Sequence, residues 1–92
     1  MKELENLAQE LGTALLARGE YLTAAESCTG GWLAQSVTAN AGSSAWFDRG
    51  FVTYSNAAKV EMLGVPEATL ANHGAVSEPT ARAMVQGALA HS

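Results

Sequence analysis

Apolar residues near the N-terminus recur every three or four positions, which is the spacing of an amphipathic helix. They are Leu4, Leu7, Ala8, Leu11, Ala14 and Leu15. This pattern predicts a helix over residues 2–18, and Gly19 is a natural stop for it. A second such pattern follows Ser77, a natural N-cap, with apolar residues at Ala81, Met84, Val85, Ala88 and Leu89.

Two stretches between these helices have the composition of strands. Residues 21–25 are short and partly β-prone, and they end at a turn containing serine and glycine. Residues 45–54 are rich in aromatic and β-branched side chains, and Asp48-Arg49-Gly50 in their middle predicts a bulge or a bend. We therefore expect two strands.

Short helices are predicted to follow each strand. Thr29 is a plausible cap for a helix ending near Thr38, and Ser55 or Asn56 for one that Gly64 ends. Pro66 can open a further helix that reaches Gly74. Alternating helices and strands predict an α/β layer fold. Because a two-stranded sheet is rarely stable alone, the strands are expected to pair with those of another copy or to belong to a larger domain.

Composition narrows the class of protein. Ninety-two residues, of which 48% are hydrophobic and 15% charged, describe a single globular domain with a small core. Five basic residues against nine acidic ones give a net charge of -4 without a basic cluster, so nucleic acid is not an expected partner. The single cysteine, the polar start and the lack of a membrane-length apolar run favour a cytoplasmic protein that does not bind membranes.

Ser27 and Lys59 are the residues best suited to chemistry. Ser27 lies where a predicted strand turns into a helix, a place that suits a nucleophile but equally a helix cap. Lys59 lies in the first turn of a predicted helix beside apolar residues, where it can act as a base if its amine is deprotonated. A solvated surface lysine is the simpler alternative. The residues alone leave both alternatives open.

Other candidates carry weaker signals. Tyr54 could relay a proton, Cys28 could be a nucleophile if His73 reached it, and the glycines of Gly30-Gly31 or Gly42-Ser43-Ser44 could bind a phosphate. Neither glycine-containing stretch has the sequence of a known phosphate-binding motif. Two dispersed histidines and one cysteine show no metal-ligand spacing, so no metal site is predicted.

Several consecutive stretches resemble the CinA C-terminal family, and the match runs nearly from end to end of the chain. They are Glu26-Ser27-Cys28-Thr29-Gly30-Gly31, residues 42–56 (GSSAWFDRGFVTYSN), Lys59, Leu63-Gly64-Val65 and His73-Gly74-Ala75-Val76-Ser77-Glu78. Enzymatic members of this family are nicotinamide-nucleotide amidases. The resemblance implies hydrolysis of the carboxamide of nicotinamide mononucleotide to nicotinic acid mononucleotide and ammonia, within pyridine-nucleotide recycling.

The resemblance also implies roles for individual residues. Ser27 would attack the amide carbon, Lys59 would be its base, and Tyr54 would help to steer the proton. The substrate-binding residues would be Thr29, Gly30 and Gly31, which would offer backbone N–H groups to the oxyanion, and Gly42, Ser43 and Ser44, which would touch the phosphate or ribose. No metal or organic cofactor is then required.

The resemblance covers about the first half of the family domain. The whole domain is a three-layer α/β/α sandwich with a mixed sheet, so residues 1–92 are expected to be a single incomplete domain with about two strands and four to five helices. A homo-oligomer is expected for the same reason. The alternative to a hydrolase is a non-catalytic half-domain that binds a nucleotide or associates with itself.

Overall fold

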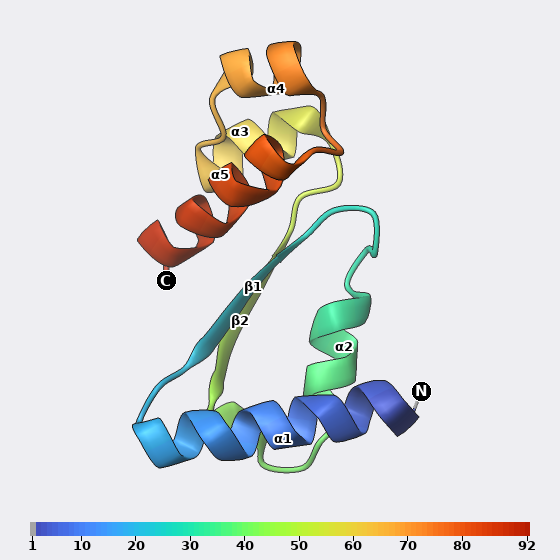
Figure 1. Cartoon of the computed structure of the whole chain (residues 1–92), viewed down its shortest axis with the longest axis vertical. Coiled ribbons are helices and arrows are strands. Elements are labelled where there is room, and N and C mark those ends of the chain that lie inside the picture. The colour runs from blue at the N-terminus through green and yellow to red at the C-terminus, as the bar shows by residue number, and fades with distance from the viewer. Residues whose placement is uncertain (1) are drawn as a thin grey trace.

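The computed structural model describes residues 2–92, which form two strands, five α-helices and one 3₁₀ turn (Figure 1). In chain order these are α1 (Lys2–Arg18), β1 (Leu22–Glu26), α2 (Trp32–Thr38), the 3₁₀ turn η1 (Ser43–Ala45), β2 (Phe47–Val52), α3 (Asn56–Leu63), α4 (Glu67–His73) and α5 (Glu78–Ala90). The predicted alternation of helices and strands is confirmed.

The two strands lie side by side and run parallel. Leu22 is opposite Phe47 and Glu26 is opposite Val52, and the pairing skips Asp48, which confirms the predicted bulge. The Thr53 N–H donates to the Glu26 carbonyl over 2.8 Å and extends the ladder past the end of β2. Parallel strands end at the same edge of a sheet, so the residues that follow β1 and β2 are neighbours.

Two small hydrophobic cores lie at opposite ends of the strands. One is centred on Ala8, Val37 and Trp46, beneath α1 and α2. The other contains four buried residues of the C-terminal half: Leu63, Val65, Met84 and Ala88. In Figure 1 the helices α1 and α2 lie at the lower end of the strands, and α3, α4 and α5 lie at the upper end.

Capping residues explain the ends of α3 and the start of α5. The Ser55 side chain accepts a hydrogen bond from the Ala58 N–H, so Ser55 and not Asn56 caps α3, and Gly64 ends that helix with a φ of 66°. Ser77 caps α5 as predicted. The prediction that Thr29 caps α2 is wrong: α2 begins at Trp32, and the Thr29 hydroxyl donates to Glu26 instead.

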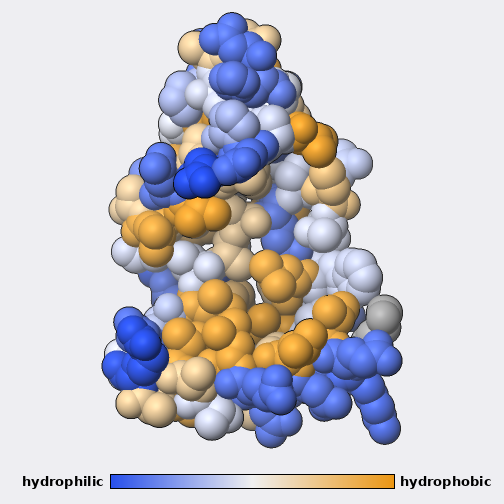
Figure 2. Space-filling view, in the orientation of Figure 1, coloured by the Kyte–Doolittle hydropathy of each residue, from blue (hydrophilic) through white to orange (hydrophobic). Residues whose placement is uncertain are grey.

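The apolar faces of α1 and α5 are only partly covered. Met84 and Ala88 of α5 are buried, whereas Val85 is 55% exposed, and on α1 Leu7 is 60% exposed. These exposed side chains border a groove between α1, α2 and β1, which is also lined by Leu4, Leu11, Trp32, Leu33 and Val37. Figure 2 shows hydrophobic atoms gathered over this face. The groove therefore leaves apolar side chains of α1, α2 and α5 partly exposed.

The helices are short. The longest, α1, has 17 residues and carries Glu3 and Glu5 in its first turn. No helix within residues 2–92 has the length and apolar character needed to cross a membrane.

Candidate functional site

Ser27 and Lys59 meet at the edge of the sheet where both strands end. The Lys59 Nζ lies 3.0 Å from the Ser27 Oγ, although 32 residues separate them in the sequence. This is hydrogen-bond distance, so a proton can pass directly between the two groups.

Main-chain carbonyls hold the Lys59 amine in place. Its Nζ donates to the carbonyl oxygen of Thr53 over 3.0 Å and to that of Tyr54 over 3.2 Å. Lys59 is only 1% exposed, and none of the ion pairs found within residues 2–92 includes it. The Nζ also donates to the Ser27 Oγ, so its three hydrogen-bond acceptors are two carbonyl oxygens and the serine oxygen. Together these contacts fix the lysine nitrogen against the serine hydroxyl.

The local sequence explains why Ser27 and Lys59 come together. β1 ends at Glu26, which puts Ser27 directly beyond the sheet edge, and β2 ends one residue before Thr53. The cap at Ser55 starts α3 at once, and Lys59 follows one turn later with its N–H bonded to the Ser55 carbonyl over 3.1 Å. The short connection from β2 to α3 thus turns Lys59 back over the end of β1.

Glu26 is a buried carboxylate of the site to which the sequence analysis gave no role. It is 3% exposed and accepts hydrogen bonds from the Thr29 hydroxyl, at 2.8 Å, and from the backbone N–H groups of Leu33 and Ala34, at 2.8 and 3.0 Å. A charged residue that ends a buried strand beside a candidate nucleophile was the signal that could have identified it.

The hydrogen bonds decide the ionisation of Glu26. Burial alone would raise the pKa of its carboxyl group, but the bonds from Thr29 and from backbone N–H groups at the start of α2 outweigh this effect. They hold the pKa below its usual value of 4.5. Glu26 is therefore ionised at neutral pH.

Few backbone N–H groups of the turn remain free to bind an oxyanion. The Gly30 N–H donates to the Ser27 carbonyl and the Trp32 N–H to the Thr29 carbonyl, each over 3.1 Å. The Gly31 N–H helps to keep the pKa of the Glu26 carboxyl low, although it donates in none of the hydrogen bonds described within residues 2–92. The N–H groups of Cys28 and Thr29 donate in none of them and do not stabilise Glu26, so these two are the most available.

The remaining predicted site residues lie at different distances from this cluster. Tyr54 touches Lys59 through its carbonyl, while its side chain is 75% exposed and its hydroxyl takes part in no hydrogen bond within the described chain. Gly42, Ser43 and Ser44 lie just before β2, at the end of the strands opposite to Ser27 (Figure 1). The structure does not bring these three residues together with Ser27, and their role stays a prediction.

A shallow pocket opens beside Ser27. It is lined by Cys28, residues 75–78 and the α5 residues Ala81 and Met84. Cys28 is exposed and free, and His73 is an exposed residue at the end of α4, with no hydrogen bond between them among the described residues. Within residues 2–92 no three histidine, cysteine or acidic side chains gather in a way that could hold a metal ion.

A serine hydroxyl bonded to a buried lysine amine is the arrangement of a Ser-Lys acyl-transfer site. In a comparison with protein families, residues 4–92 match the model of the CinA C-terminal domain. The chain belongs to the CinA family, as its sequence motifs predicted.

Individual relatives agree with this assignment. The chain is 63% identical over 87 residues to the nicotinamide-nucleotide amidohydrolase PncC of Escherichia coli K12, a match that covers 95% of this chain and 53% of that protein. It is 50% identical over 92 residues to PncC of Pseudomonas putida, covering all of this chain and 58% of the relative. The chain thus spans about half the length of these relatives.

Solved structures give the same result for the fold. A crystal structure of the competence/damage inducible protein CihA from Agrobacterium tumefaciens superposes with a TM-score of 0.93 at 52% identity, covering 97% of this chain and 54% of that one. A CinA superfamily protein from Escherichia coli superposes with a TM-score of 0.94 at 39% identity, over 97% and 52% of the two chains. The predicted partial α/β fold of this family is confirmed.

Proposed function

We propose that this chain is the nucleophile-bearing half of an amidohydrolase that converts nicotinamide mononucleotide to nicotinic acid mononucleotide and ammonia. The 3.0 Å contact between the Ser27 Oγ and the Lys59 Nζ is the observation that carries the proposal. The names of the PncC relatives supply the substrate, and their identity of 50% or more over nearly the whole chain supports its transfer to this protein.

In the proposed mechanism, the Ser27 oxygen attacks the carboxamide carbon while its proton passes to the Lys59 amine. Lys59 then gives the proton to the departing nitrogen, and ammonia leaves as the carbon–nitrogen bond breaks. Water attacks the resulting Ser27 ester, again losing a proton to Lys59, and that proton returns to the serine oxygen as the acid is released. The same amine serves as base and acid in both halves of the reaction.

Backbone N–H groups of the turn after Ser27 would stabilise the negative oxygen of the tetrahedral intermediate. The sequence predicts Thr29, Gly30 and Gly31 for this role, and Thr29 is the strongest of the three because its N–H neither donates in a hydrogen bond described within residues 2–92 nor stabilises Glu26. Gly30 could serve only if its bond to the Ser27 carbonyl opened. Tyr54 could take part if its exposed side chain folded over the bound substrate.

We further propose that residues 1–92 are an incomplete domain. The chain spans about half the length of its PncC relatives, and the apolar groove beside β1 leaves Leu7, Trp32 and Val85 partly exposed. Full activity is therefore expected only when further protein covers this groove.

The experiment is an assay of ammonia release from nicotinamide mononucleotide. It compares the chain alone with the chain mixed with a polypeptide that corresponds to the unmatched half of Escherichia coli PncC. We expect release in the mixture, its loss in Ser27→Ala, and near-normal release in Cys28→Ala, which changes the neighbouring exposed side chain. Release that survives Ser27→Ala, or no release under either condition, would refute the proposed activity.

A self-associating half-domain is the second candidate. The observation that favours it is the same groove, whose exposed apolar side chains a second copy could cover. Sedimentation equilibrium distinguishes the two ideas, because a stable dimer without ammonia release would favour this candidate and a monomer at all concentrations would exclude it.

A further inference from the structure

Glu26 links three parts of the chain that together shape the turn carrying Ser27. Its backbone carbonyl accepts from the Thr53 N–H, which fixes it to the end of β2. Its carboxylate accepts from the Thr29 hydroxyl in the middle of the turn. The same carboxylate accepts from the N–H groups of Leu33 and Ala34 in the first turn of α2. Glu26 therefore spans the turn from the strand to the helix.

The turn itself has few internal constraints. It contains Gly30 and Gly31, whose φ values of 61° and 111° lie in the left-handed region. Glycine adopts this backbone conformation more easily than any other residue because it has no Cβ atom. Its own backbone bonds are one from Gly30 to Ser27 and one from Trp32 to Thr29. A flexible turn with two such bonds needs an external support to hold Ser27 against Lys59.

We infer that Glu26 is a positioning residue for Ser27: its buried carboxylate holds the turn so that the serine oxygen stays within reach of the Lys59 amine. This inference rests on the proposed Ser-Lys function. Glu26 need not touch the substrate, because it acts through Thr29 and through the start of α2. By holding the Thr29 side chain it also holds the peptide whose N–H is free for an oxyanion.

A second consequence concerns the start of α2. Helix starts with free N–H groups attract anions, but here the Glu26 carboxylate already accepts from Leu33 and Ala34. The chain's own carboxylate therefore occupies this helix start.

Glu26→Gln is the substitution that tests this role of the carboxylate. Three donors converge on two acceptor oxygens, and the amide in Glu26→Gln keeps only one acceptor and replaces the other by an NH₂ group. Whichever way the amide turns, at least one donor faces another donor. The shape of the side chain is kept, so the change is confined to its charge and its hydrogen bonds.

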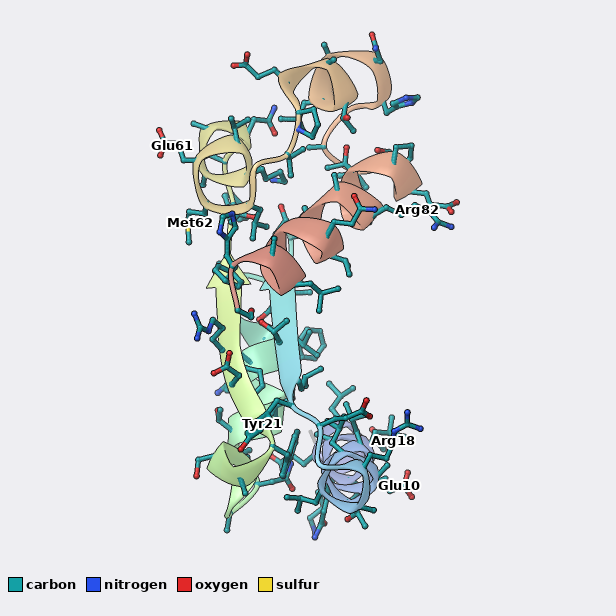
Figure 3. The ribbon with its side chains drawn as sticks, turned by 90° about the vertical axis from the view of Figure 1, so that its left-hand side faces the viewer. Glu10, Arg18, Tyr21, Glu61, Met62 and Arg82 are labelled. Atoms are coloured by element: carbon teal, nitrogen blue, oxygen red, sulfur yellow. The ribbon has the colours of Figure 1, made fainter. Side chains whose placement is uncertain are left out.

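Glu10→Gln is the matched control. It makes the same change of charge and size at an exposed position of α1, where the Glu10 side chain takes part in none of the described hydrogen bonds. Figure 3 shows Glu10 on α1, at the opposite end of the molecule from Glu61 on α3.

Two measurements on the folded 92-residue chain test the inference. The first is amide hydrogen exchange of Leu33, Ala34 and the turn residues. The second is the rate at which phenylmethylsulfonyl fluoride labels Ser27, followed by mass spectrometry at saturating and limiting reagent. In Glu26→Gln we expect exchange at Leu33 and Ala34 to rise at least about 10-fold, and the maximal labelling rate to fall by about 10- to 100-fold with little change in half-saturation. Both should be unchanged in Glu10→Gln.

A pair of changes at Thr29 covers the case in which Glu26→Gln fails to fold. Thr29→Val removes the hydroxyl at constant shape, whereas Thr29→Ser keeps it. We expect slower labelling in the first variant and recovery in the second, with both variants folded by circular dichroism.

The outcomes separate the inference from the proposed function. If Ser27 of the unchanged protein is labelled neither alone nor in the mixture with the unmatched half of PncC, the proposed function fails, and hydrogen exchange alone decides whether Glu26 holds the turn. If Ser27 is labelled equally fast in Glu26→Gln and in the unchanged protein, the positioning role is refuted while the proposed function stands. Unchanged exchange at Leu33 and Ala34 would refute the positioning role in either case.

Discussion

Gly87 marks the point where α5 packs most closely on α3. A Cβ atom built on Gly87 would overlap the carbonyl oxygen of Leu63, the last residue of α3. Because the obstacle is backbone at a helix end, it cannot turn away as a flexible side chain could. We predict that Gly87→Ala forces α5 away from α3.

The magnitude follows from two opposing effects. Overpacking a close contact typically costs about 1–3 kcal/mol of folding free energy. Because the obstacle here is backbone, we take the upper value of about 3 kcal/mol. Alanine is better than glycine inside a helix by about 1 kcal/mol, which offsets part of that cost. The net loss in the free energy of unfolding is therefore about 2 kcal/mol. For a domain of this size, that corresponds to a fall in Tm of about 8–16 °C.

Thermal unfolding followed by circular dichroism measures this effect. Gln86→Ala is the matched control, since it introduces the same residue at the neighbouring exposed position of α5 and should change stability by less than about 0.5 kcal/mol. A Tm of Gly87→Ala equal to or above that of the unchanged protein would show that α5 does not pack on α3 as described.

Two further predictions concern buried polar groups near the site. The lowered pKa of Glu26 means that its contribution to stability is fully present above the unfolded pKa and is lost as pH falls through the folded one. Urea unfolding should thus show less acid destabilisation below about pH 4.5 in Glu26→Gln than in the unchanged protein, and parallel acid curves would contradict this. Thr53 is fully buried, and within the described chain its hydroxyl has no hydrogen-bond partner. Thr53→Val should therefore leave the free energy of unfolding unchanged or raise it by about 1 kcal/mol, and a loss larger than about 1 kcal/mol would reveal a partner for the hydroxyl.

The elements that the sequence predicted best are those with strong local signals. The repeat of leucines and alanines located α1 at Lys2–Arg18, and Ser55, Gly64 and Ser77 located the ends of α3 and the start of α5. Each of these residues acts on its own segment through capping or through a left-handed backbone conformation, so its effect can be recognised without the tertiary structure.

The parts that the sequence did not predict depend on distant partners. Thr29 has the chemistry of a cap, yet Glu26 takes its hydroxyl because the turn brings the two side chains together. The position of Lys59 in a helix is equally consistent with a solvated side chain. Lys59 is buried because its side chain packs against the residues that follow the two strands, which the sequence of the helix does not reveal. Val85 is exposed because no other element of the described chain packs over it. The helical periodicity predicts that Val85 is on the apolar face of α5 but not whether another element covers that face.

The contact between Ser27 and Lys59 is the centre of this account, and labelling of Ser27 in Lys59→Met tests it most directly. Methionine is an unbranched side chain that ends at Cε and so lacks the terminal amine, and Lys2→Met makes the same change at an exposed position of α1. With both variants folded, we predict that phenylmethylsulfonyl fluoride labels Ser27 at least about 100-fold more slowly in Lys59→Met and at the original rate in Lys2→Met. Equal labelling rates in Lys59→Met and the unchanged protein would contradict the claim that Lys59 activates Ser27.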